Sequence, residues 1–252
     1  MKKLIKDTLQ DLYPALLLLA LMWLVFLTNV VVPYDLNNWG IFSEKKEGLW
    51  GIIFSPVLHG SWAHLLSNSV PVFVLTYLLY RFYRSIALST IVISWIMVGV
   101  LVWITGLSGV HIGMSGVIYA LASFLFFSGL IRKYKPLIGI SFFIAFMYGS
   151  LIWWILPLKE GVSWQSHLWG GVIGFILAIY YRKKGPKEPK YQYEIEEEMG
   201  IEPEMPVEVR SIAEERAKIQ EEQQKNTIHT DENQQVKIRY RVIPKKRIKI
   251  DA

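Results

Sequence analysis

Long apolar stretches fill most of the first 184 residues, and they restrict what this chain can fold into. Each stretch is close to the ~20 residues that an α-helix needs to cross the hydrocarbon core of a bilayer. The stretches are residues 13–32, 62–80, 86–105, 115–131, 136–156 and 164–181. A segment in lipid must satisfy its backbone hydrogen bonds internally, which favours helices. The sequence therefore predicts an all-α polytopic membrane protein with a bundle of six transmembrane helices in residues 1–184.

The first apolar stretch follows Lys2, Lys3 and Lys6, as the apolar part of a secretory signal peptide would. This stretch is longer than the apolar region of a signal peptide, and no small-residue cleavage site precedes Pro33. We therefore expect it to remain in the membrane as an anchor.

Lysine and arginine in the connecting segments predict the orientation. One set of segments holds Lys2, Lys3, Lys6, Arg81, Arg84, Arg132, Lys133, Lys135, Arg182, Lys183 and Lys184. The alternate loops, 33–61, 106–114 and 157–163, hold only Lys45, Lys46 and Lys159. Because short cytoplasmic loops carry the excess of basic residues, both termini are predicted to be cytoplasmic and these three loops to face outward. We expect a bacterial inner membrane as the setting.

The net charge of +6 is explained by this topology and by contact with anionic lipids of the bilayer. No nucleic-acid partner is expected. The chain has no cysteine, which excludes disulfides and thiolate metal sites.

Composition changes at Gly185, after which charged residues and prolines replace the apolar stretches. Residues 185–252 are expected to form a charged cytoplasmic tail that is partly disordered or a small regulatory segment, with a folded domain as the alternative. Within it, 208–225 has the charge spacing of a solvated helix. Residues 236–242 alternate apolar and basic side chains, which is typical of a strand.

Polar residues occur at the outward ends of three predicted spans. Ser115 begins the fourth span, His167 begins the sixth, and His64 and Asn68 lie in the first turns of the second. A serine nucleophile is activated by a histidine base within ~2.6–3.2 Å. These residues therefore point to acyl transfer, with His64, Asn68 and the Ser115 backbone N–H as donors to an oxyanion.

Each of these residues also has a structural explanation. Ser115 lies between Gly113 and Gly116 at a helix start, where a serine often caps the helix. The small-xxx-small pair Gly170 and Gly174 is typical of helix packing in membranes. Such packing would also bring the sixth helix close enough for its histidine to reach the serine. Similarly, Asn68 could simply join two helices by a hydrogen bond.

Between residues 50 and 181 the only acidic residue is Glu160, in an outer loop. A Ser/His dyad is therefore expected in place of a triad with an acid. Tyr119, one helical turn after Ser115, could pack on His167 and orient it. The same scarcity argues against a zinc hydrolase, which recruits a carboxylate. Two alternatives stay open: a small-solute transporter, and a metal site built only from the outer histidines His59, His64, His111 and His167. We expect no metal or cofactor.

Three segments together resemble the rhomboid family of intramembrane serine proteases. They are HGSWAHLLSN at 59–68, GMSGVIYAL at 113–121 and SHLWGGVIG at 166–174. The resemblance implies that Ser115 is the nucleophile and His167 the general base. It also implies that His64 and Asn68 hold the oxyanion, that Tyr119 stacks on the base, and that His59 supports the first outer loop.

The resemblance further implies a six-helix bundle that hydrolyses peptide bonds in or next to the spans of single-span membrane proteins. Substrates would enter through a lateral gate beside the fifth helix. The chain departs from the family pattern at Gly51, where many members have an arginine after the tryptophan, and at Met114, where small residues are common. A catalytically silent rhomboid-like protein that binds membrane clients is the alternative function.

Overall fold

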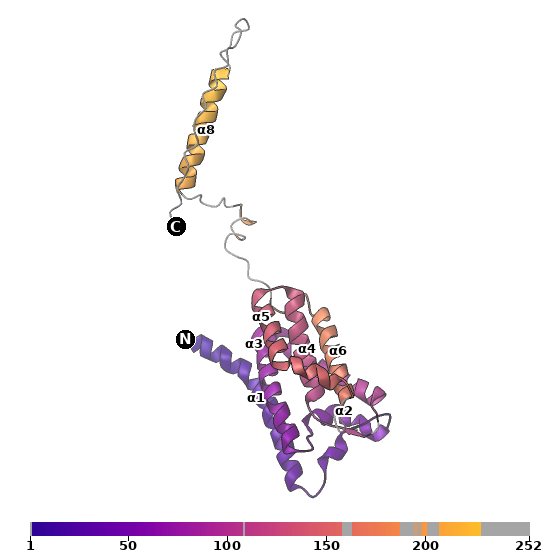
Figure 1. Ribbon diagram of the computed structural model, residues 1–252. Coiled ribbons are helices and arrows are strands. Elements are labelled where there is room, and N and C mark those ends of the chain that lie inside the picture. Colours follow the sequence, from indigo (N-terminus) through magenta and orange to yellow (C-terminus); the bar gives the residue numbers. More distant parts are fainter. Residues whose placement is uncertain are drawn as a thin grey trace, which may run out of the picture. The chain divides into compact units, whose positions relative to one another are not determined.

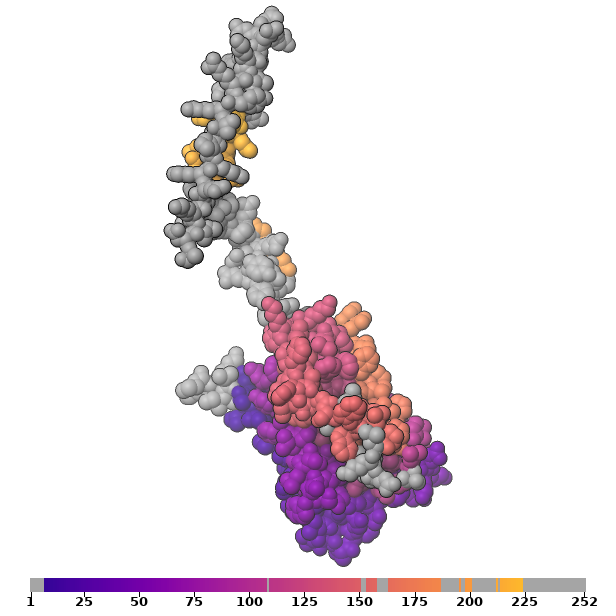
Figure 2. Space-filling model, in the orientation of Figure 1, coloured from indigo at the N-terminus to yellow at the C-terminus, as the bar shows by residue number. Residues whose placement is uncertain are grey.

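The computed structural model describes residues 2–107, 109–157, 163–186, 195, 198–200 and 207–227. The chain divides into two units, residues 1–188 and 189–252. Figure 1 shows the helices of the first unit, and Figure 2 shows how side chains fill the spaces between those ribbons.

The first unit is a helical bundle. Its longer helices are α1 (Lys2–Val31), α3 (Trp62–Thr105), α4 (Ser115–Arg132), α5 (Lys135–Tyr148) and α6 (Trp164–Tyr180). Among the described residues, Asp7–Val31 of α1, all of α3 and all of α4 are long and apolar enough to cross a membrane, and α5 is a shorter apolar helix. Large apolar side chains face outward, among them Phe146, which is 87% exposed. These features define a multi-pass membrane protein, because such a surface needs lipid to cover it.

α3 contains two of the predicted spans. As a straight helix its 44 residues would extend about 66 Å, roughly twice the hydrocarbon core. Helical geometry is interrupted at Tyr83 (φ −131°, ψ 33°). The neighbouring Arg84 donates to Asp11 near the start of α1, whereas Trp62 packs edge-on against Phe26 near its end. Trp103, near the far end of α3, donates to the Lys45 carbonyl in the loop after α1. Both ends of α3 therefore contact the end of α1 or the loop that follows it, and the helix turns at Tyr83, between the stretches predicted at 62–80 and 86–105.

The loop over residues 33–61 is folded and is joined to the loop that precedes α4. It contains η1 (Leu36–Trp39), β1 (Ile41–Phe42), η2 (Lys46–Leu49), α2 (Gly51–Phe54) and η3 (Ser55–Val57). β1 pairs antiparallel with β2 (Val110–His111), with Ile41 opposite His111. This small sheet fixes the backbone that leads into α4.

Gly51 has a structural explanation in this loop. A Cβ at Gly51 would lie 2.3 Å from the carbonyl oxygen of Gly40, so the two backbones are in direct contact. A side chain at this position would force the loop apart. Close backbone packing therefore holds this part of the loop.

The fifth predicted span differs from the observed structure. In place of one helix over 136–156, α5 ends at Tyr148 and the chain continues as the 3-10 segment η4 (Gly149–Ile155). Tyr148 leaves helical geometry (φ −123°, ψ 3°), and Gly149, a weak helix former, follows. The chain after Tyr148 therefore follows a different course from the predicted α-helix.

Glycines bring α4 and α6 into close contact, as Figure 1 shows for the two ribbons. A Cβ at Gly170 would lie 2.2 Å from the Gly116 carbonyl oxygen, and one at Gly174 would lie 2.1 Å from that of Ala120. The helices are thus packed backbone to backbone, as small residues in membrane helices permit.

In the second unit the structure describes the helix α8 (Val207–Thr227), over the stretch expected at 208–225. The strand expected at 236–242 lies outside the described residues.

Candidate active site

Ser115 and His167 meet at the contact between α4 and α6. Ser115 is the first residue of α4 and His167 lies in the first turn of α6. The Ser115 hydroxyl and Nε2 of His167 are 2.9 Å apart. Ser115 is not the helix cap, because Met114 occupies that position and no side chain caps the helix. The serine hydroxyl is instead within proton-transfer distance of an imidazole nitrogen.

A backbone carbonyl and an aromatic ring orient His167. Its Nδ1 lies 2.8 Å from the carbonyl oxygen of Trp154 in η4. Because a carbonyl only accepts, Nδ1 carries the proton and Nε2 offers its lone pair to the Ser115 hydroxyl. Tyr119 stacks on the imidazole, with ring centroids 4.2 Å apart and an interplanar angle of 6°. The carbonyl occupies the position at Nδ1 that an acid has in a triad, and the sequence did not reveal it because its position depends on the course of the chain after Tyr148.

Asn68 is held by His59, a second contact that the sequence did not reveal. The Asn68 side chain is buried, and its Nδ2 lies 3.1 Å from Nε2 of His59. Nδ1 of His59 lies 3.2 Å from the Val57 carbonyl oxygen. His59 therefore donates from Nδ1 and accepts from the Asn68 amide. This arrangement fixes the amide orientation and leaves its second N–H for another acceptor.

Gly113 brings the backbone before Ser115 against the two predicted oxyanion donors. Its φ is +105°, which favours glycine. A Cβ there would lie 2.5 Å from Nε2 of His64 and 3.5 Å from Nδ2 of Asn68. The Gly113 N–H donates to the Ser55 carbonyl, 2.8 Å away. The structure thus brings both predicted donors beside the segment that leads into Ser115.

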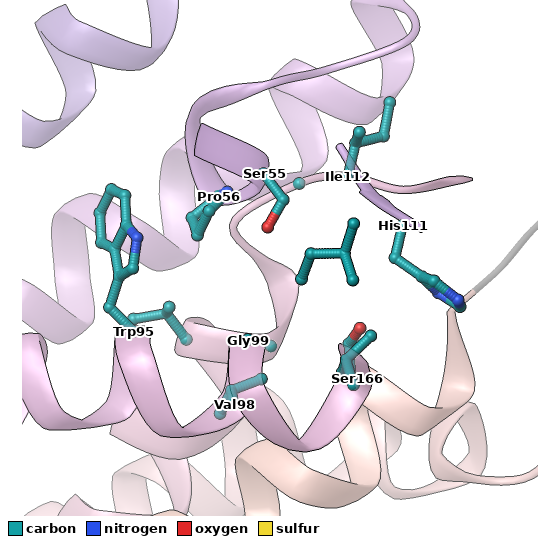
Figure 3. Close-up of a pocket in the computed structure, with 13 residues that line it drawn as sticks. Ser55, Pro56, Trp95, Val98, Gly99, His111, Ile112 and Ser166 are labelled. Carbon is teal, nitrogen blue, oxygen red and sulfur yellow. The ribbon is translucent and has the colours of Figure 1, made fainter. Parts of the chain in front are cut away.

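A small cavity adjoins this segment (Figure 3). Its lining combines α3, the loop over residues 33–61 and the start of α6, and it includes Gly113 and Gly116 on either side of Ser115. A Cβ at Gly116 would lie 2.7 Å from Cγ1 of Val98, so glycine is required for this close packing.

The histidines do not form a metal centre in the described part of the chain. There, no three His, Cys, Asp or Glu side chains are grouped so that they could bind an ion. His59 and His64 contact each other edge-on, with centroids 4.9 Å apart, and His111 binds different partners. The described residues therefore lend no support to the metal-site alternative.

Burial of His59 predicts a loss of stability in acid. Desolvation, with a contribution from His64, lowers the pKa of His59 from 6.5 to about 4, although the Val57 carbonyl opposes the shift. Below pH 6.5 the unfolded chain binds this proton first, so stability present above pH 6.5 is lost as pH falls toward 4. The full loss is about 3 kcal/mol. Thermal unfolding in detergent at pH 7 and pH 4.5 measures it, and His59→Gln, which cannot titrate, should show a smaller pH difference. An equal difference in both proteins would refute this assignment.

The fold and the site define a helical, multi-pass membrane protein with a serine and a histidine paired at one end of its bundle. The sequence profile of the Rhomboid domain family matches residues 46–184. The chain belongs to the rhomboid family.

Relatives in mycobacteria extend this comparison. An uncharacterised protein of Mycobacterium leprae is 36% identical over 170 residues, which cover 64% of this chain and 67% of that protein. An uncharacterised protein of Mycobacterium tuberculosis strain H37Rv is 36% identical over 168 residues, which cover 63% of this chain and 70% of the relative.

Proposed function

We propose that this protein is an intramembrane serine endopeptidase that cleaves single-span membrane proteins in or next to their spans. The observation that carries the proposal is the contact between Ser115 and His167. The serine hydroxyl faces an imidazole nitrogen at 2.9 Å while the other imidazole nitrogen donates to a backbone carbonyl. A histidine held in this tautomer is ready to accept the serine proton.

In the first half of the reaction, Ser115 Oγ attacks the scissile carbonyl carbon and its proton passes to Nε2 of His167. The carbonyl oxygen becomes an oxyanion. Collapse of this tetrahedral intermediate breaks the C–N bond, and His167 returns the proton to the leaving amine. The product is an acyl-enzyme ester on Ser115 and a free amino terminus.

In the second half, a water molecule attacks the ester carbonyl. His167 accepts a proton from that water, a second oxyanion forms, and collapse releases Ser115 with its proton restored from His167. No acid is required at Nδ1 because the Trp154 carbonyl stabilises the imidazolium that forms twice in each cycle.

The oxyanion is stabilised by the backbone N–H of Ser115, by Asn68 Nδ2 and by His64. First-turn N–H groups have no partner within their own helix, and Ser115 supplies one at the start of α4. His59 holds the Asn68 amide with one N–H still available. The donors are thus oriented before charge develops, which is what makes such donors effective.

Asn68→Ala is expected to lower kcat by about 100- to 1,000-fold, because one donor to the oxyanion is lost. Ser67→Ala is the matched control: its exposed hydroxyl contacts the His64 carbonyl, and wild-type kcat is expected. Reporter cleavage at saturating substrate measures both variants. A kcat for Asn68→Ala within a few fold of the control would remove Asn68 from the oxyanion site.

We further propose six spans, with α3 supplying two, and both termini in the cytoplasm. The site then lies toward the outer face, and substrates enter beside α5. The kink at Tyr83 and the contacts of Trp62 and Trp103 with the end of α1 and the loop after it support opposite directions for the spans before and after Tyr83. Basic residues such as Arg84 and Arg132 lie at the opposite end of the bundle from Ser115. Cysteine labelling of single-cysteine variants placed in loop 33–61 and in the tail tests this topology.

The direct test of function uses the purified full chain in liposomes with a panel of single-span reporters. Wild type is expected to cleave at least one reporter near the outward end of its span, and Ser115→Ala none. Cleavage that persists in Ser115→Ala would contradict the mechanism. A wild-type protein that binds reporters but neither cleaves them nor reacts with a fluorophosphonate would favour the silent, client-binding alternative.

A further inference from the structure

A chain of side-chain hydrogen bonds connects the segment before Ser115 to the start of α6. His111 of β2 is buried, and its Nδ1 lies 2.7 Å from the hydroxyl of Ser163. That hydroxyl lies 2.5 Å from the hydroxyl of Ser166. His111 and Ser166 also line the cavity beside Ser115, and Figure 3 shows both at its edge.

The direction of these hydrogen bonds follows from one contact. Nε2 of His111 lies 3.1 Å from the Leu107 carbonyl oxygen, which only accepts, so Nε2 carries the proton. Nδ1 therefore accepts from the Ser163 hydroxyl, and the Ser163 oxygen accepts from Ser166. Every member of this partly buried chain has a partner, and a polar network with all its members paired rigidifies its surroundings.

Ser163 occupies the N-cap position of α6 but does not cap it. An N-cap serine usually accepts from a backbone N–H of the first turn, an interaction that stabilises a helix by ~1 kcal/mol. Here no side-chain cap bond forms, and the hydroxyl faces His111 instead. The carbonyl of Ser163 accepts from the N–H of Ser166 and of His167, so the residue that contacts His111 also begins the turn that carries His167.

We propose that the His111–Ser163–Ser166 chain is a positioning element that sets the distance between Ser115 and His167. His111 lies four residues before the serine and Ser163 four residues before the histidine, so the contact joins the two segments just outside the dyad. Gly170 and Gly174 fix the helices deeper in the bundle. The side-chain contact fixes them at the outer end, where the reacting atoms lie. This inference rests on the proposed protease function.

Ser163→Ala removes the hydroxyl that joins the two segments. Its kcat is expected to fall about 10- to 100-fold, the size of effect that a ~1 Å misplacement has, with KM nearly unchanged. Ser163→Thr keeps the hydroxyl and should restore most of the activity. His111→Phe keeps a ring of similar size without either hydrogen bond and should match Ser163→Ala. Ser43→Ala, which removes an outer-loop hydroxyl bonded to the Val102 carbonyl, is the control with wild-type kcat.

Thermal unfolding of each variant in detergent identifies proteins that remain folded. Folded Ser163→Ala and His111→Phe proteins with wild-type kcat would overturn the positioning role. The positioning role would also be overturned if these variants changed only KM, or if Ser163→Thr did not restore the activity that Ser163→Ala loses. A failure of the proposed function would give a different result, because wild type itself would then cleave no reporter. In that case the positioning role would fail as well.

Nitrogen-15 NMR of the imidazoles adds a readout that does not depend on activity. His111 is expected as the Nε2–H tautomer, opposite to the Nδ1–H tautomer expected for His59 and His167. In Ser163→Ala the Nδ1 signal of His111 should shift because its donor is lost. An Nδ1–H tautomer of His111 in the wild type would overturn the hydrogen-bond chain.

Discussion

Ser115→Ala and His167→Ala are each expected to lower kcat for a single-span reporter by about 10⁴-fold or more, and the double variant no further. The serine is a poor nucleophile without the base, and the base has no function in acylation without the serine. Their side chains share one hydrogen bond of 2.9 Å, so removing either residue removes the same interaction.

Purified variants reconstituted at equal concentration provide this measurement, with Ser67→Ala as the control for an unrelated serine. Circular dichroism before each assay verifies that the helices are retained. Losses that multiply in the double variant would mean that the two residues act in separate steps, and the dyad would have to be abandoned.

Gly170→Ala is expected to destabilise the bundle by about 1–3 kcal/mol and to lower cleavage strongly, although it adds one methyl group. That methyl would lie 2.2 Å from the Gly116 carbonyl oxygen and 2.8 Å from Cβ of Tyr119. Backbone atoms cannot move aside as a flexible side chain does, so α6 must shift away from α4. The shift lengthens the Ser115–His167 contact.

Gly171→Ala is the matched control for this prediction. It adds the same methyl group one residue later, where nothing lies within 4 Å. Because alanine is the better helix former by up to about 1 kcal/mol, this variant should be as stable as wild type or more so. Thermal unfolding in detergent and reporter cleavage measure both variants. Equal stability of the two would show that close packing at Gly170 is not what holds α4 against α6.

The pairing of Ser115 with His167 was predictable from the sequence because it depends on regular structure. Apolar stretches of spanning length, positive loops and small residues at helical spacing place the two side chains at one depth on neighbouring helices. The stacking of Tyr119 follows from the same helical spacing. Helical spacing and the resemblance to rhomboids together predicted these contacts.

The partners that orient the candidate site were not predictable in this way. The Trp154 carbonyl reaches His167 from the 3-10 segment that follows Tyr148, and an apolar composition does not reveal where α5 stops. His59 reaches Asn68, and His111 reaches Ser163, from loops whose shapes depend on tertiary contacts. The close backbone contact at Gly51 likewise depends on loop folding. Irregular backbone brings these groups together, and no periodic pattern encodes it.

Mass spectrometry of the protein after reaction with a fluorophosphonate tests the central claim most directly. The probe forms a stable adduct only with a serine that a neighbouring base has activated. We expect one adduct, on the peptide that contains Ser115, formed at a rate that falls sharply in His167→Ala. An adduct on another serine, or undiminished labelling of Ser115→Ala, would contradict it.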